Sequence, residues 1–166
     1  MSAVAVLTLV HTAISLVGIF SGLGVLALML EGRDNPGWTR VFLVTTVLTS
    51  ASGFLFPFTR LLPSHVVGAI SLVVLAVVLY ARHGRAEQGR WGQVFVIGSV
   101  LALWLNVFVL VAQLFAKIPA LHDVAPTQTE PPFGITQLAV LAVFVVLGAK
   151  ATRRARAPAP VPRPAM

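Results

Sequence analysis

Residues Trp104–Gln137 read WLNVFVLVAQLFAKIPALHDVAPTQTEPPFGITQ, an apolar helical segment followed by a proline-bracketed loop and the start of another apolar segment. Asn106, Gln113 and Lys117 fall on one face of the first helix, because a helix turns about 100° per residue. An unpaired amide is costly within a membrane, so Asn106 and Gln113 are expected to point at protein and not at lipid. The rest of the chain must then supply partners for this polar face.

The composition is that of a membrane protein. Of 166 residues, 57% are hydrophobic and only 10% are charged, against about 25% charged in soluble domains. Five uncharged runs each approach or exceed the ~17–25 residues that cross about 30 Å of hydrocarbon. We therefore expect an all-α, polytopic helical bundle over residues 1–150 with about five transmembrane helices. The predicted helices cover residues 4–30, 41–56, 64–80, 91–118 and 133–149.

The basic residues indicate the orientation of the bundle. Ten of the twelve Lys and Arg residues fall on one side of the predicted membrane, and only Arg60 and Lys117 fall on the other. The positive-inside rule makes the ten-residue side cytoplasmic, so the N-terminus is expected outside and the C-terminus inside. Trp38, Tyr80 and Trp91 then all lie at the cytoplasmic interface. Topology thus accounts for the net charge of +7, and no nucleic-acid partner is expected.

The two ends of the chain differ in character. No Lys or Arg precedes Arg33, and the first apolar run is far longer than the ~7–15 residues of a signal-peptide core, so no cleavable signal is expected. Residues 151–166 are basic and rich in Pro and Ala, which predicts a disordered cytoplasmic tail. The chain has no cysteine, which excludes disulfides and thiolate metal sites.

Three strings carry a resemblance to a known family: PFTRLLPSHVVGAISLVVLA at 57–76, LWLNVFVLVAQLFAKIPAL at 103–121 and APTQTEPPF at 125–133. They resemble a family of small, functionally uncharacterised bacterial inner-membrane proteins, over roughly residues 41–149. The resemblance implies a multi-pass protein of the bacterial cytoplasmic (inner) membrane. It implies no mechanism and assigns no functional residue.

Histidine is the side chain best able to hold a haem in a helical bundle. His11 and His65 are expected at similar depths on the outer side, where they are candidate axial ligands of one b-type haem. His11 also lies on a stripe with Ser15, Gly18 and Gly22, whose small residues favour helix packing. A hydrogen-bonded structural role is therefore the favoured interpretation of both histidines. No spacing such as H-E-x-x-H supports a zinc or copper site.

The outer ends of the last two helices carry a second group of polar residues. Lys117 ends one helix and Glu130 precedes the next, near Gln137. Adjacent helices joined by a short loop bring such ends together, so a Lys117–Glu130 salt bridge is expected. The alternative is an outward-facing polar vestibule that binds a small ligand or a proton.

No enzyme motif is present: the sequence has no G-x-S-x-G and no phosphate-binding glycine loop. Five spans also do not divide into the inverted repeats of a secondary transporter. We therefore expect a non-enzymatic structural or partner-binding membrane subunit. Its partners would be the lipid bilayer and either a second copy or another membrane protein. The alternative is an electron-transfer protein with haem between His11 and His65.

Overall fold

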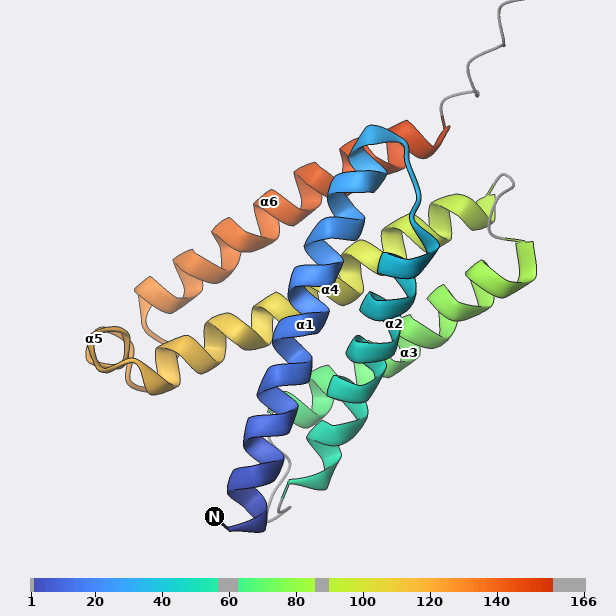
Figure 1. The fold of residues 1–166 in the computed structure, drawn as a ribbon. Helices are drawn as coiled ribbons and strands as arrows, with labels where there is room; N and C mark the ends of the chain where they lie inside the picture. The colour runs from blue at the N-terminus through green and yellow to red at the C-terminus, as the bar shows by residue number, and fades with distance from the viewer. Residues whose placement is uncertain (1, 57–62, 86–89, 157–166) are drawn as a thin grey trace, which may run out of the picture.

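Every regular element in the described part of the chain is helical, as the composition predicts (Figure 1). The computed structural model describes residues 2–56, 63–85 and 90–156. Its elements are α1 (Ala3–Glu31), α2 (Pro36–Ser52), a 3₁₀ turn η1 (Gly53–Leu55), α3 (Pro63–Arg85), α4 (Arg90–Lys117), α5 (Pro119–His122) and α6 (Pro131–Arg156). Helices α1, α3, α4 and α6 are long and apolar enough to cross a membrane. Helix α2 has 17 residues.

Capping residues set the helix boundaries more than the apolar runs do. Asn35 Oδ1 accepts hydrogen bonds from the N–H groups of Gly37 and Trp38, at 3.0 and 3.2 Å. Helix α2 therefore begins at Pro36, before the predicted start at residue 41. Gly32 ends α1 in the left-handed conformation, at φ 71°, which glycine adopts without steric cost.

The last helix is longer than predicted. Helix α6 continues to Arg156, so the first six residues of the expected disordered tail, 151–156, are helical. Alanine and arginine are strong helix formers, and their propensity extends the helix beyond the apolar run. Residues 157–166 lie outside the described residues. The predicted boundary at residue 149 marks the end of the apolar part of α6, and the helix itself ends at Arg156.

Helix α4 is the centre of the bundle, in contact with α1, α2, α3 and α6 (Figure 1). The tightest junction is at Gly22 of α1, where an added Cβ would lie 2.7 Å from Leu103 Cδ1 and 2.8 Å from the ring of Phe42. Leu103 and Phe42 are themselves 1% exposed. Gly98 plays the same part between α4 and α3, because its missing Cβ makes room for Val78. Small residues thus let the helix backbones approach closely.

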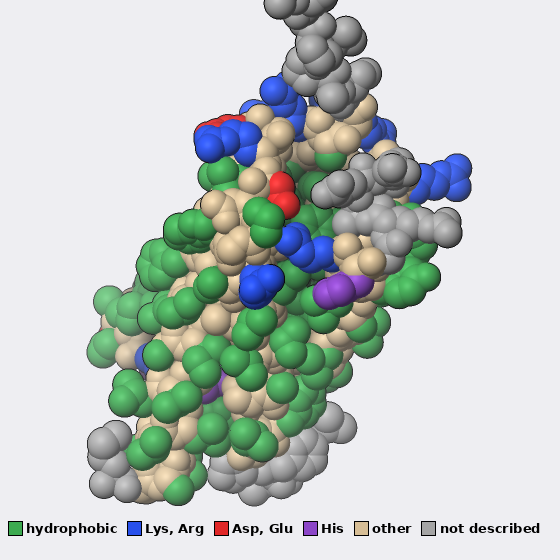
Figure 2. Space-filling view, turned by 45° about the vertical axis from the view of Figure 1, so that its right-hand side comes forward, with side chains coloured by type: hydrophobic (Ala, Val, Ile, Leu, Met, Phe, Trp, Pro, Cys, Tyr) green, Lys and Arg blue, Asp and Glu red, His purple; other side chains and the backbone are tan. Residues whose placement is uncertain are grey.

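The surface divides by polarity along the bundle. Hydrophobic side chains cover most of the face in Figure 2, and the basic side chains gather mainly toward its upper end. That end holds the α1–α2 connection and the C-terminus of α6 (Figure 1). The Tyr80 and Trp91 rings also meet there, with centroids 5.1 Å apart. An aromatic pair beside basic residues is typical of a membrane–water interface.

The junction at Gly22 predicts a large effect of a small substitution. Gly22→Ala should lower the free energy of unfolding by roughly 1–3 kcal/mol, the usual cost of overpacking, because Phe42 and Leu103 have no free space. The matched control is Gly134→Ala, since a Cβ at Gly134 meets nothing within 4 Å. That variant should be neutral or slightly stabilising. Thermal unfolding in detergent measures both, and equal losses would contradict the packing described.

Candidate functional site

The predicted polar face of α4 separates into a buried part and an exposed part. Asn106 is buried and its Nδ2 donates to Thr46 Oγ1 of α2 at 3.3 Å. Gln113 and Lys117 are exposed, so the expectation that Gln113 points at protein is wrong. Helix α4 is about 42 Å long, and Gln113 lies about 14 Å from its midpoint, at the edge of a ~30 Å hydrocarbon layer. Its amide therefore needs no protein partner.

The predicted salt bridge between Lys117 and Glu130 does not form, although both residues are described. The Glu130 carboxylate instead accepts hydrogen bonds from the N–H and hydroxyl of Thr127, at 3.2 and 2.9 Å, and from the N–H of Thr129, at 3.1 Å. Desolvation raises the pKa of Glu130, but hydrogen bonds from its own backbone, Thr127 and Thr129 outweigh it and lower this pKa below its ordinary value. Donors within three residues satisfy the carboxylate locally, without Lys117.

Two glutamines attach the loop before α6, and α6 itself, to α4. Gln128 Nε2 donates to the carbonyl of Ala112 at 2.7 Å, and Gln137 Nε2 donates to the carbonyl of Phe108 at 3.0 Å. Sequence reasoning selected Gln137 but missed Gln128, whose left-handed backbone (φ 60°) turns its amide toward α4. The polar residues of this region therefore hold elements together.

His11 and His65 both lie beside η1. His11 Nδ1 is 2.8 Å from Ser52 Oγ. The His11 and Phe56 rings pack edge to face, with centroids 5.3 Å apart. The Ser52 hydroxyl hydrogen is used in a bond to the carbonyl of Thr49 at 3.2 Å. In the tautomer that donates from Nδ1 to Ser52 Oγ, Nε2 of the neutral ring has a lone pair able to bind a metal.

His65 belongs to the same end of the bundle but to another helix. It is 6% exposed, and its ring lies 5.8 Å from that of Phe54. Within the described ranges, no group of three or more His, Asp or Glu residues is arranged to hold a metal ion.

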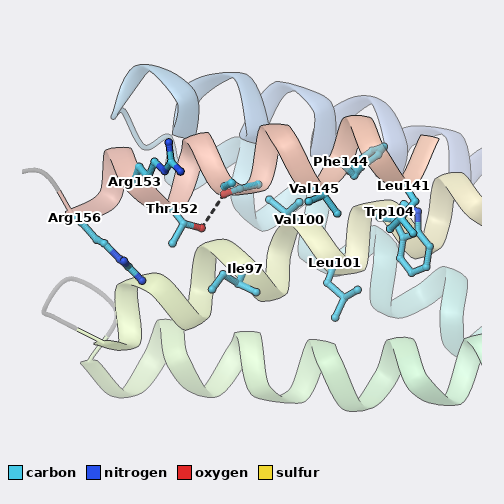
Figure 3. Close-up of a pocket in the computed structure, with 12 residues that line it drawn as sticks. Ile97, Val100, Leu101, Trp104, Leu141, Phe144, Val145, Thr152, Arg153 and Arg156 are labelled. Carbon is cyan, nitrogen blue, oxygen red and sulfur yellow. Dashed lines mark hydrogen bonds between the residues drawn. The ribbon is translucent and has the colours of Figure 1, made fainter. Parts of the chain in front are cut away.

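A groove of about 460 Å³ runs between α4 and α6 (Figure 3). Ile97, Leu101 and Val145 on its walls are exposed, so it opens sideways between two membrane helices. At Gly148 an added Cβ would come within 3.1 Å of Val100 Cγ1, so the glycine allows α4 and α6 to approach closely beneath the groove. The full lining is Ile97, Val100, Leu101, Trp104, Leu141, Phe144, Val145, Gly148, Ala149, Thr152, Arg153 and Arg156.

The groove is apolar along most of its length and basic at one end. Thr152, Arg153 and Arg156 line that end, and Figure 3 shows Arg156 extending toward the first turn of α4 and Arg153 on the edge of α6 away from α4. Arg154 instead packs over Gly32 at the α1–α2 connection. Sequence reasoning missed this site, because residues 151–156 were predicted to be disordered. The signal was the i, i+3 spacing of Arg153 and Arg156, which places both on one side of a helix.

Comparisons with protein-family models, with curated proteins and with solved structures find no significant match for this chain. Function is therefore inferred from two separate features, the apolar groove with a basic end and the histidines beside η1.

Proposed function

We propose that this chain is a non-enzymatic, multi-pass protein of a bacterial cytoplasmic membrane that acts as a structural or partner-binding subunit. The observation that carries the proposal is the sideways opening of the α4–α6 groove, bordered by exposed apolar side chains. A site reached from the bilayer suits a lipid or another membrane helix better than a water-soluble substrate. The polar residues also support a structural role, because Asn106, Gln128 and Gln137 bond to neighbouring elements.

The proposed function includes five spans with the N-terminus outside and the C-terminus inside. Helix α2 would be the fifth span: at 17 residues it measures about 26 Å, and η1 extends it by three residues. Buried Thr39, Thr46 and Thr49 face other helices, which leaves Val41, Val44 and Leu48 exposed toward lipid.

The number of spans can be tested by parity, because the natural chain has no cysteine. Ser2→Cys and Ala155→Cys should be labelled by an impermeant maleimide from opposite sides of the membrane if α2 spans. Ser2 should be labelled in intact cells, and Ala155 only after permeabilisation. Labelling of both positions from one side would leave four spans and would contradict the proposed topology.

The subunit role predicts that the chain occurs with another polypeptide in its native membrane. Extraction into polymer-bounded lipid particles, without detergent, should give particles that contain more than one 17.6 kDa chain or this chain with a second protein. Differently tagged copies expressed together distinguish self-association from a separate partner. Particles that hold a single chain and lipid only would contradict the partner-binding role.

A b-type haem protein is the second candidate, favoured by the contact of His11 Nδ1 with Ser52 Oγ, since donation from Nδ1 to Ser52 would leave Nε2 to bind iron. Metal-bound histidines commonly donate their other ring N–H in this way. His11 and, from α3, His65 would hold the haem, whose iron would supply one-electron transfer.

Absorbance spectra decide between the two candidates. Under the haem candidate, protein expressed with haem supplied shows a Soret band, and His11→Ala or His65→Ala removes or shifts it. His83→Ala is the matched control, because His83 is exposed and bonds to the Leu79 carbonyl in its own helix. A colourless wild-type protein, or a band that survives both substitutions, would exclude the haem candidate.

A further inference from the structure

The α4–α6 groove is apolar along most of its length and basic at one end, which matches the apolar chains and charged headgroup of a phospholipid. Its walls from Leu141 to Ala149 on α6 are apolar, and Thr152, Arg153 and Arg156 follow at one end. The apolar part is about 12 Å long at 1.5 Å per residue. One leaflet of a ~30 Å hydrocarbon layer is about 15 Å deep. The apolar part of the groove thus matches an acyl chain within one leaflet.

The basic end lies at the level of lipid headgroups. Arg154 packs over Gly32 of the α1–α2 connection, which lies at the same end of the bundle as the C-terminus of α6 (Figure 1). Trp38 is in the first turn of α2, just after that connection, and the Tyr80–Trp91 pair joins the C-terminal part of α3 to the first turn of α4. Trp104, at the other end of the groove, is near the middle of α4. A lipid in the groove would therefore have its phosphate beside the arginines and its chain directed toward Trp104.

The charges at this end are available to an anion. Arg153 and Arg156 are exposed, and the salt bridge that the described residues contain joins Arg33 to Glu31. Guanidinium groups bind phosphate oxygens through paired N–H donors. Arg156 also extends toward the first turn of α4 (Figure 3), where the helix dipole is positive. Basic pockets between membrane helices are typical sites for anionic headgroups.

We propose that the α4–α6 groove binds an anionic phospholipid, with its phosphate held by Arg153 and Arg156 and one acyl chain along Val145 and Trp104. This inference rests on the proposed function, in which the groove is reached from the bilayer. The headgroup charge distinguishes the ligand, because zwitterionic lipids have the same chains and no net charge. Each basic residue near the membrane surface strengthens the binding of an anionic lipid about fivefold. The two arginines should therefore favour an anionic over a zwitterionic lipid by about 25-fold.

Fluorescence quenching of Trp104 tests the proposal at the groove itself. In a Trp38→Phe/Trp91→Phe background, Trp104 is the remaining tryptophan. The protein is placed in phosphatidylcholine bilayers that contain increasing fractions of phosphatidylglycerol with brominated chains, or of brominated phosphatidylcholine. Brominated phosphatidylglycerol should quench Trp104 at about 25-fold lower mole fraction. Equal quenching by the two lipids would overturn the proposal.

Two pairs of matched variants separate the groove from general surface charge and bulk. Arg153→Gln/Arg156→Gln should abolish the preference, whereas Lys150→Gln/Arg154→Gln removes the same charge outside the groove and should retain it. Val145→Phe narrows the groove and should reduce quenching. Val146→Phe, on an exposed position of α6 outside the groove, should not. Equal effects within either pair would overturn the proposal. Circular dichroism and gel filtration establish that each variant is folded.

Other occupants give different results. If glycerol phosphate raises the melting temperature as much as phosphatidylglycerol does, the site takes a free anion and the proposal is wrong. If Val145→Phe converts a dimer to a monomer while the lipid preference is absent, the groove is an interface between copies, and the proposal is again wrong. A single chain in the native lipid particles would contradict the partner-binding role, but the quenching experiment would still measure lipid preference on that chain.

Discussion

The close approach of three helices at Gly22 is the contact on which the rest of the bundle depends. Helices α1, α2 and α4 meet there because a hydrogen replaces a side chain, and Phe42 and Leu103 fill the remaining space. In a membrane no hydrophobic force drives apolar helices together, so close packing and interhelical hydrogen bonds must hold them. The Asn106–Thr46 hydrogen bond joins α4 to α2 near this junction and fixes their register.

The groove is a consequence of where α6 packs. Helix α4 also contacts α1, α2 and α3, and α6 packs against α4 and α1 while most of its apolar side chains stay exposed. Gly148 and Val100 bring the two helices close, and Gln137 attaches α6 to the Phe108 carbonyl. Ile97 and Leu101 of α4 and Val145 of α6 are exposed along the groove that remains between the two helices, which opens sideways. Its basic end exists because α6 continues beyond its apolar run to Arg156.

Local hydrogen bonds explain why the predicted outer site differs from the observed one. Spacing along the chain placed Lys117 and Glu130 at adjacent helix ends, and that expectation ignored the backbone of the loop between them. Loop N–H groups near a helix start need acceptors, and Glu130 satisfies those of Thr127 and Thr129. A carboxylate with donors so close gains little from a flexible ammonium in water.

The sequence alone determined the properties that depend on composition and on local hydropathy. Uncharged runs and basic flanks indicated an all-α membrane bundle, and the stripe containing Gly18 and Gly22 indicated the packing side of α1. The tertiary structure alone decided which polar side chains are covered and where the surface is hollow. Asn106 and Gln113 lie on one helical face, yet only Asn106 meets a partner, because α2 passes beside it. The groove likewise depends on Val100 and Gly148, which are far apart in the chain, and hydropathy is a local quantity that carries no information about such contacts.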